Sequence, residues 1–126
     1  GCRASNVVVL DLDHHRDQAV DGVARLAAVC ERPGAEWPVT LTVGTPSGGR
    51  HLYFRAPPHR VVLSASGARS PLGPGVDVRA PGRRLGGYVL GPDSRTPAGR
   101  YTVAVDVPVA PMPPWLVEVL AVPARA

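Results

Sequence analysis

Two aspartates that follow an apolar run are the first residues of this chain suited to chemistry. Asp11 and Asp13 come at the end of Val7–Leu10, whose β-branched residues predict a buried strand. Side chains alternate along a strand, so the two carboxylates share one face and Leu10 and Leu12 share the other. Carboxylates at this spacing suit a hard divalent cation such as Mg²⁺, which takes oxygen ligands. The alternative interpretation is that both acids simply lie where the strand reaches solvent.

A second group of polar residues follows a glycine pair. The segment reads Ser47-Gly-Gly-Arg-His51-Leu-Tyr-Phe-Arg55, and alternation places His51 and Tyr53 on one face, opposite the apolar side chains. The glycines allow a ligand to approach the backbone and its N–H groups to face phosphate. No Gly-Lys-Ser/Thr follows them, so this is not a Walker loop. Taken alone, the segment is better explained as an ordinary hairpin turn with an exposed histidine.

Two later segments also mix polar residues with apolar ones. In Gly75-Val-Asp77-Val-Arg79 the polar side chains point away from the valines. A third carboxylate on the face that carries the first two is costly unless a cation relieves the repulsion, although a surface pair of Asp77 and Arg79 is the simpler explanation. We expect the three aspartates to converge on one open sheet face from adjacent strands. The segment Gly86-Gly-Tyr-Val-Leu-Gly-Pro-Asp-Ser94 lines a pocket or forms a hairpin, and the hairpin is favoured.

The elements that must position these residues are strands with few helices. Hydrophobic periodicity and turn residues predict helices at 16–30 and 114–121. They predict strands at 7–13, 39–43, 50–55, 75–79, 87–90 and 100–107. We expect a single domain over residues 1–126, of fold class α+β, with a mainly antiparallel sheet.

Composition narrows the class of protein. The 126 residues are 44% hydrophobic, but no apolar run approaches the roughly 20 residues that span a bilayer, so a membrane protein is excluded. All 14 basic residues are Arg and the net charge is +4, which makes an anionic partner plausible. Cys2 and Cys30 lack the spacing of a zinc site, and two free thiols predict a reducing, cytoplasmic location.

The four segments, in this order, resemble the bifunctional primase–polymerase (Prim-Pol) domain of the archaeo-eukaryotic primase superfamily, over about Asn6 to Leu120. A single Asp-x-Asp is a weak signal, whereas the ordered set is specific. The motifs are Val8-Val-Leu-Asp-Leu-Asp13, Thr45-Pro-Ser-Gly-Gly-Arg-His51-Leu-Tyr-Phe54, Gly75-Val-Asp-Val-Arg79 and Gly86-Gly-Tyr-Val-Leu-Gly-Pro-Asp-Ser94. The resemblance implies an RRM-like catalytic core.

The resemblance also implies site residues and substrates. The catalytic, metal-binding residues would be Asp11, Asp13 and Asp77, holding two divalent ions, Mg²⁺ or Mn²⁺. The nucleotide's phosphates would contact His51, Arg79, Ser47, Gly48 and Gly49. The implied activity is template-directed nucleotidyl transfer by a DNA primase/polymerase that acts on (d)NTPs, with a replicative helicase domain or protein as a further partner. A template strand would lie, through sequence-independent backbone contacts, on a surface that carries Arg50, Arg55, Arg60 and Arg69.

The chain departs from the family in one respect that bears on activity. The family domain has a further portion before its first motif, and here only Gly1–Ser5 precede it. We therefore expect a truncated catalytic domain with weak or no polymerase activity by itself. An apolar surface left bare would then be covered by dimerisation or by another packing arrangement.

Alternative functions from other classes remain. A phosphatase of the haloacid dehalogenase type also carries Asp-x-Asp after a strand, but it has Thr or Val where this chain has His15. Such a phosphatase also needs a lysine, and this chain has none. A sugar-nucleotide glycosyltransferase leaves Gly75–Arg79 unexplained. The main alternative is a non-catalytic relic of a Prim-Pol domain that binds nucleic acid or nucleotide, and Mn²⁺ with dNTP would not stabilise a relic that has lost its site.

Overall fold

The structure, a computed structural model, describes residues 7–15, 20–58, 60–65, 70–73, 75–80, 95–96 and 99–122. Its main element is a six-stranded sheet with the order β10-β4-β5-β1-β7, in which β11 also pairs with β5. The strands are β1 (Val7–Leu12), β4 (Thr42–Gly44), β5 (Arg50–Arg55), β7 (Val76–Arg79), β10 (Thr102–Val105) and β11 (Ala110–Pro111). Every pairing in this sheet is antiparallel except the one between β11 and β5. The α+β class with a mostly antiparallel sheet is confirmed, and the RRM-like core stays a prediction.

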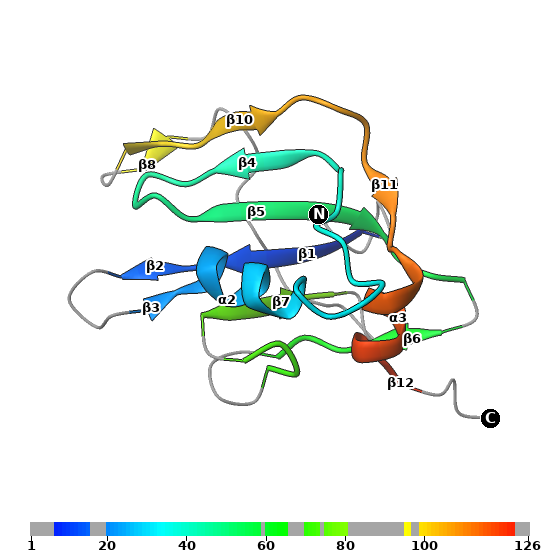
Figure 1. Cartoon of the computed structure of the whole chain (residues 1–126). Helices are drawn as coiled ribbons and strands as arrows, with labels where there is room; N and C mark the ends of the chain where they lie inside the picture. The colour runs from blue at the N-terminus through cyan, green and yellow to red at the C-terminus, as the bar shows by residue number, and fades with distance from the viewer. Residues whose placement is uncertain are drawn as a thin grey trace.

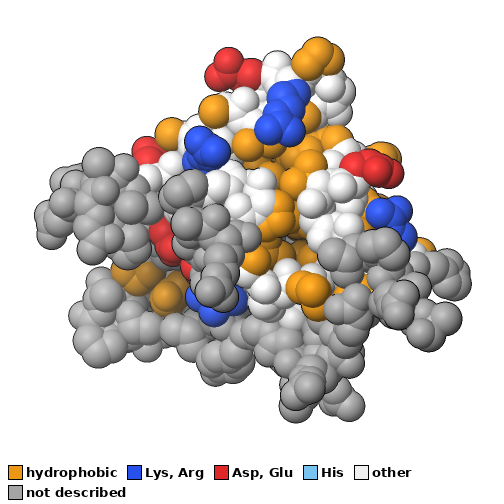
Figure 2. Space-filling model, turned by 90° about the horizontal axis from the view of Figure 1, so that it is seen from below, with side chains coloured by type: hydrophobic (Ala, Val, Ile, Leu, Met, Phe, Trp, Pro, Cys, Tyr) orange, Lys and Arg blue, Asp and Glu red, His pale blue; other side chains and the backbone are white. Residues whose placement is uncertain are grey.

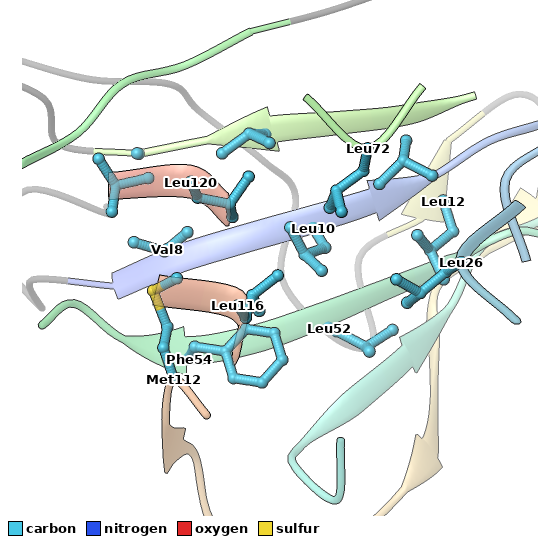
Figure 3. Packing of buried hydrophobic residues seen from close by; sticks show 14 of the residues in the cluster. Val8, Leu10, Leu12, Leu26, Leu52, Phe54, Leu72, Met112, Leu116 and Leu120 are labelled. Carbon is cyan, nitrogen blue, oxygen red and sulfur yellow. The ribbon is translucent and has the colours of Figure 1, made fainter. Parts of the chain in front are cut away.

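Two short helices cover one face of this sheet. Figure 1 shows α2 (Gly22–Val29) and α3 (Pro114–Leu120) on the same side of the strands. Leu10 lies opposite Leu52 on one neighbouring strand and Val78 on the other, and these side chains pack against Leu26 and Leu116 from the helices (Figure 3). Because burial of apolar surface is the main driving force of folding, this layer determines which face of the sheet is left for polar residues.

Three small two-stranded ribbons complete the described structure, all antiparallel. β2 (His14–His15) pairs with β3 (Val20–Asp21), β6 (Val61–Val62) with β12 (Ala121–Val122), and β8 (Arg95–Thr96) with β9 (Gly99–Arg100). None of the helices in the described residues is long and apolar enough to cross a membrane. Cys30 is a free thiol, as expected, whereas Cys2 lies outside the described residues.

The prediction of a helix at 16–30 is wrong at its beginning. Val20 and Asp21 form a strand, and the helix begins only at Gly22; residues 16–19 lie outside the described part of the chain. The Asp21 carboxylate accepts a hydrogen bond from the Ala24 N–H at 3.0 Å, so Asp21 is the N-cap. An N-cap residue has an extended backbone and satisfies a donor that the first helical turn leaves unpaired, and this local signal outweighs the hydrophobic periodicity that continues upstream.

The other predicted elements that fall within the described residues are all present, and most of them differ at their limits. The helix at 114–121 is confirmed as α3, with Pro114 in its first turn, where a missing N–H costs nothing. The strand expected at 39–43 is displaced to Thr42–Gly44, and the one expected at 100–107 is divided between β9 and β10. The strand expected at 87–90 lies outside the described residues.

The hydrophobic core reaches the surface on one side of the molecule. Seen from below, hydrophobic side chains form a band between charged ones (Figure 2). Several residues at the margin of the core are only partly buried, among them Val117 and Val119 in α3 and Ala121 directly after it. Dimerisation through a bare apolar surface stays a prediction.

Candidate active site

Pairing of the central strands brings three of the predicted site residues into one row across the sheet. Asp11 in β1 lies directly opposite His51 in β5 on one side and Asp77 in β7 on the other. These residues alternate with the buried leucines and valines, so the row lies on the face opposite the helices. The predicted convergence of aspartates from adjacent strands is therefore confirmed. The face is not an open one, because Val9 on the same side of β1 is fully buried and the Asp11 and Asp77 side chains are each only 14% exposed.

The third carboxylate joins the row from the residue just beyond β1. Carboxylate oxygens of Asp11, Asp13 and Asp77 all lie within 4.8 Å of one another, and all three residues are half-buried. Oxygens bound to one Mg²⁺ at about 2.1 Å are at most about 4.2 Å apart, and a pair of ions about 3.5–4 Å apart spreads its ligands more widely. Both the oxygen donor set and its spacing fit divalent cations of this kind.

Asp13 is held by its backbone, and three glycines make this possible. The Asp13 N–H donates to the Gly75 carbonyl at 2.8 Å, and its carbonyl accepts from the Gly22 N–H at 2.6 Å. A Cβ on Gly22 would lie 2.2 Å from the Gly75 oxygen, and one on Gly49 would lie 2.3 Å from the carbonyl oxygen of Leu12. Only glycine permits such close packing of backbone segments. The start of α2, the start of β7 and the turn before β5 therefore close around the end of β1.

A histidine and an arginine flank the carboxylates. His51 Nε2 lies 3.2 Å from Asp11 Oδ1, and Arg79 Nη2 lies 3.7 Å from Asp11 Oδ2 and 3.8 Å from Asp77 Oδ2. Burial raises the pKa of Asp11, but hydrogen bonds and charge from His51, a hydrogen bond with Asp13 and the charge of Arg79 together lower it below its usual 3.8. Asp11 is therefore ionised at neutral pH, which is the form of a carboxyl group that binds a divalent cation.

Two buried nitrogen atoms beside the carboxylates have no protein partner. Among the described residues, the buried side-chain atoms without a hydrogen-bond partner are His51 Nδ1 and Arg79 Nε. An unsatisfied buried polar group costs about 1–3 kcal/mol, and native proteins contain few of them. Both atoms belong to groups that donate to phosphate oxygens. A ligand with oxygen atoms that binds at this site would supply the missing hydrogen-bond partners and remove the cost.

The turn between β4 and β5, which we call the glycine loop (residues 45–49), lies next to the end of β1. Gly48 has φ +94°, a conformation that favours glycine. The Gly48 N–H donates to the Thr45 carbonyl at 3.1 Å, and the Gly49 N–H donates to Thr45 Oγ1 at 3.0 Å. Phosphate contact through these two N–H groups would require exchange of those bonds, and nucleotide binding by Ser47, Gly48 and Gly49 stays a prediction.

Two side chains contact the site that sequence reasoning did not assign to it. Tyr101, from the segment before β10, packs its ring against His51 with centroids 5.6 Å apart. His14 places Nδ1 3.1 Å from the Ser47 carbonyl. His14 could have been found from the sequence, because it directly follows the Asp-x-Asp motif. No local pattern connects Tyr101 with a histidine fifty residues earlier.

The predicted arginine surface does not form as one surface. Arg50 and Arg55 lie at opposite ends of β5 and, five residues apart, on opposite faces of the sheet. Their guanidinium groups donate to the carbonyls of Gly49 at 2.8 Å and Val109 at 3.1 Å. Arg60 is exposed before β6, and Arg69 and the motif at 86–94 lie outside the described residues.

The comparison with protein families agrees with this geometry. Residues 1–115 match the family described as bifunctional DNA primase/polymerase, N-terminal (Prim-Pol). Since the match covers most of the chain, the chain belongs to the Prim-Pol family, whose members are primases and polymerases and hence nucleotidyltransferases. None of the curated proteins matches it.

Proposed function

We propose that this chain catalyses template-directed nucleotidyl transfer as a DNA primase/polymerase, with two divalent ions, Mg²⁺ or Mn²⁺, held by three aspartates. One observation carries the proposal: carboxylates from β1 and β7 gather within 4.8 Å, beside two buried nitrogen atoms that lack partners. A purely structural role does not favour such an arrangement, because like charges repel and unpaired buried polar atoms are costly. A bound nucleotide with its cations would relieve both costs.

The aspartates would hold the ions through Asp11, Asp13 and Asp77. In this chemistry the bound ions lower the pKa of the attacking 3′-hydroxyl and stabilise the pyrophosphate that leaves. Asp11 keeps its charge because its pKa is lowered, so it is ready to bind a cation at neutral pH. The backbone contacts that fix Asp13 keep its carboxylate at the required position without an ordering cost at the moment of binding.

His51 and Arg79 would hold the phosphates of the incoming nucleotide. His51 Nε2 is directed to Asp11, and Nδ1 would donate to a phosphate oxygen from the ring form in which both nitrogens carry hydrogen. Imidazole is a poor ligand in an oxygen-rich Mg²⁺ site. Arg79 lies between two carboxylates, and its unpaired Nε is a further N–H donor for a phosphate oxygen. Ser47, Gly48 and Gly49 would line the phosphates from the adjacent glycine loop.

The substrates would be a (d)NTP and a DNA primer on its template. With a net charge of +4 and no lysine, the chain would bind the DNA backbone through arginine, independently of sequence. A replicative helicase domain or protein is a further proposed partner.

Thermal unfolding tests the site before activity is considered. We expect Mn²⁺ together with dATP to raise the melting temperature more than either ligand does alone, because each ligand neutralises the charge of the other. His51→Ala should weaken the nucleotide response more than the response to Mn²⁺ alone. Glu118→Gln is the matched control, since it changes an exposed acid on α3, on the other side of the sheet.

Primer extension tests the reaction itself. A templated primer incubated with Mn²⁺ and dNTPs should be extended at most weakly by this chain alone, and Asp77→Ala should abolish that extension while Glu118→Gln leaves it intact. A chain that neither extends the primer nor responds to metal and nucleotide in thermal unfolding would be the non-catalytic relic, and the proposal would be wrong.

A further inference from the structure

His14 connects the two parts of the proposed site that bind different groups. It follows the metal-binding residue Asp13 in the chain, and its Nδ1 lies 3.1 Å from the carbonyl oxygen of Ser47 in the glycine loop. A carbonyl oxygen only accepts, so Nδ1 carries the hydrogen and donates. This contact joins the end of β1 to a loop that lies 33 residues further along the chain.

The imidazole also lies beside Gly48. Gly48 has φ +94°, and a Cβ at this position would lie 3.5 Å from His14 Nδ1, which is an ordinary contact distance. Ser47 and Gly48 are exposed, and the bonds between Thr45 and the two glycines close the loop on itself without attaching it to β1. The His14 bond links the loop to the first residue of β2, just beyond β1, and Gly49 passes close to the Leu12 carbonyl at the end of β1.

We propose that His14 is a positioning residue that holds the glycine loop against the metal-binding end of β1, and so sets the loop for the phosphates of the nucleotide. The proposal rests on the proposed function for its nucleotide part, whereas the attachment of the loop does not depend on it. His14 need not touch the nucleotide. It acts through the Ser47 carbonyl, by lowering the cost of ordering the loop when a nucleotide binds.

Two substitutions at this position separate the hydrogen bond from the presence of a side chain. His14→Leu removes the donor. His14→Asn keeps one, because the side-chain amide nitrogen of asparagine occupies nearly the same place as Nδ1 of histidine. A neutral hydrogen bond of this kind corresponds to about a three- to tenfold change in an equilibrium constant, and this is the size of effect to be measured.

Hydrogen exchange measures the attachment without any ligand. In EDTA, the Gly48 and Gly49 amides should exchange about three- to tenfold faster in His14→Leu than in the wild type, and His14→Asn should restore slow exchange. The amides of Leu10 and Leu52 in the central strands should exchange equally in all three proteins, which shows that each variant is folded. Unchanged exchange at Gly48 and Gly49 in His14→Leu overturns the proposal.

Steady-state kinetics or nucleotide titration measures the consequence for binding. We expect His14→Leu to raise KM for dNTP about three- to tenfold with kcat within about twofold, and His14→Asn to be close to wild type. Faster exchange without any change in KM overturns the positioning role. A wild-type chain that binds no nucleotide refutes the proposed function, and the exchange result then still decides whether His14 attaches the loop.

Discussion

Removal of the Asp77 carboxylate tests whether this residue binds metal or only supports the structure. Asp77→Asn preserves shape and removes a charge that faces Asp11 and Asp13 within 4.8 Å. At that distance and an effective dielectric constant of about 20, two unit charges repel by about 3.5 kcal/mol. The Arg79 guanidinium, 3.8 Å from Asp77, attracts it by about 4 kcal/mol on the same scale.

Repulsion and attraction oppose one another in the protein without metal. Asp11 and Asp13 repel Asp77 and Arg79 attracts it, so loss of the Asp77 charge removes both contributions. Solvent screening reduces repulsion and attraction alike, because the Arg79 side chain is 39% exposed. We therefore expect Asp77→Asn to lower the free energy of unfolding in EDTA by no more than about 1 kcal/mol.

The effect on metal binding should be much larger. Loss of groups that merely orient metal ligands weakens affinity about 10- to 100-fold, so loss of a ligand should weaken it at least about 100-fold. With Mn²⁺ at about 100 times its dissociation constant, the wild type gains about 2.7 kcal/mol of stability and the variant about 0.4 kcal/mol. For a domain of this size these gains correspond to a rise in melting temperature of about 10 °C and about 1–2 °C.

Calorimetric unfolding with EDTA and with Mn²⁺, together with Mn²⁺ titration, measures both quantities. Glu118→Gln makes the same change of net charge on an exposed residue of α3, and it should retain the full response to metal. The reasoning is refuted if Asp77→Asn loses several kcal/mol in EDTA yet keeps the Mn²⁺ response. In that case Asp77 would be the structural partner of Arg79.

Three further substitutions test the local physics. The lowered pKa of Asp11 means that its charge contributes stability above pH 3.8, and this stability is lost as the pH falls through the lower folded-state value. In urea unfolding with EDTA, the difference in free energy of unfolding between the wild type and Asp11→Asn should therefore shrink below pH 4. A difference that does not depend on pH would contradict this. Gly49→Ala places a Cβ 2.3 Å from the Leu12 carbonyl and should cost about 1–3 kcal/mol in thermal unfolding, whereas Gly44→Ala, whose Cβ would meet nothing nearer than 3.6 Å, should cost little. Asp21→Ala should cost about 1 kcal/mol through loss of the N-cap, and Asp21→Asn, which still caps, should recover most of it.

The polar and apolar faces of the central strands could be predicted from local pattern. An extended backbone turns successive side chains to opposite faces, and the apolar set of β1 must be buried. Leu10 therefore faces the core (Figure 3), and Asp11 faces away from it. The same argument placed His51 correctly, because a shift of one residue would bury the histidine and expose Leu52 and Phe54.

The start of the first helix could not be predicted from periodicity. Apolar residues recur at helical spacing from Val20 onward, but periodicity cannot show where a backbone leaves the strand and enters the helix. That limit depends on hydrogen bonds that Asp21 makes to the first turn and Gly22 makes to Asp13. The first of these is an N-cap signal that the sequence does carry, and the second exists only in the folded protein.

The sequence alone therefore determined which residue types share a strand face, that the strands outnumber the helices, and that the ordered motifs are those of a Prim-Pol domain. Tertiary structure decided which strands are neighbours, and so that Asp77 lies beside Asp11, Tyr101 against His51, and His14 against the glycine loop. The physical reason is that alternation is a property of one extended segment. Pairing instead depends on how distant segments fill a common core, and the same local pattern is compatible with many different partners.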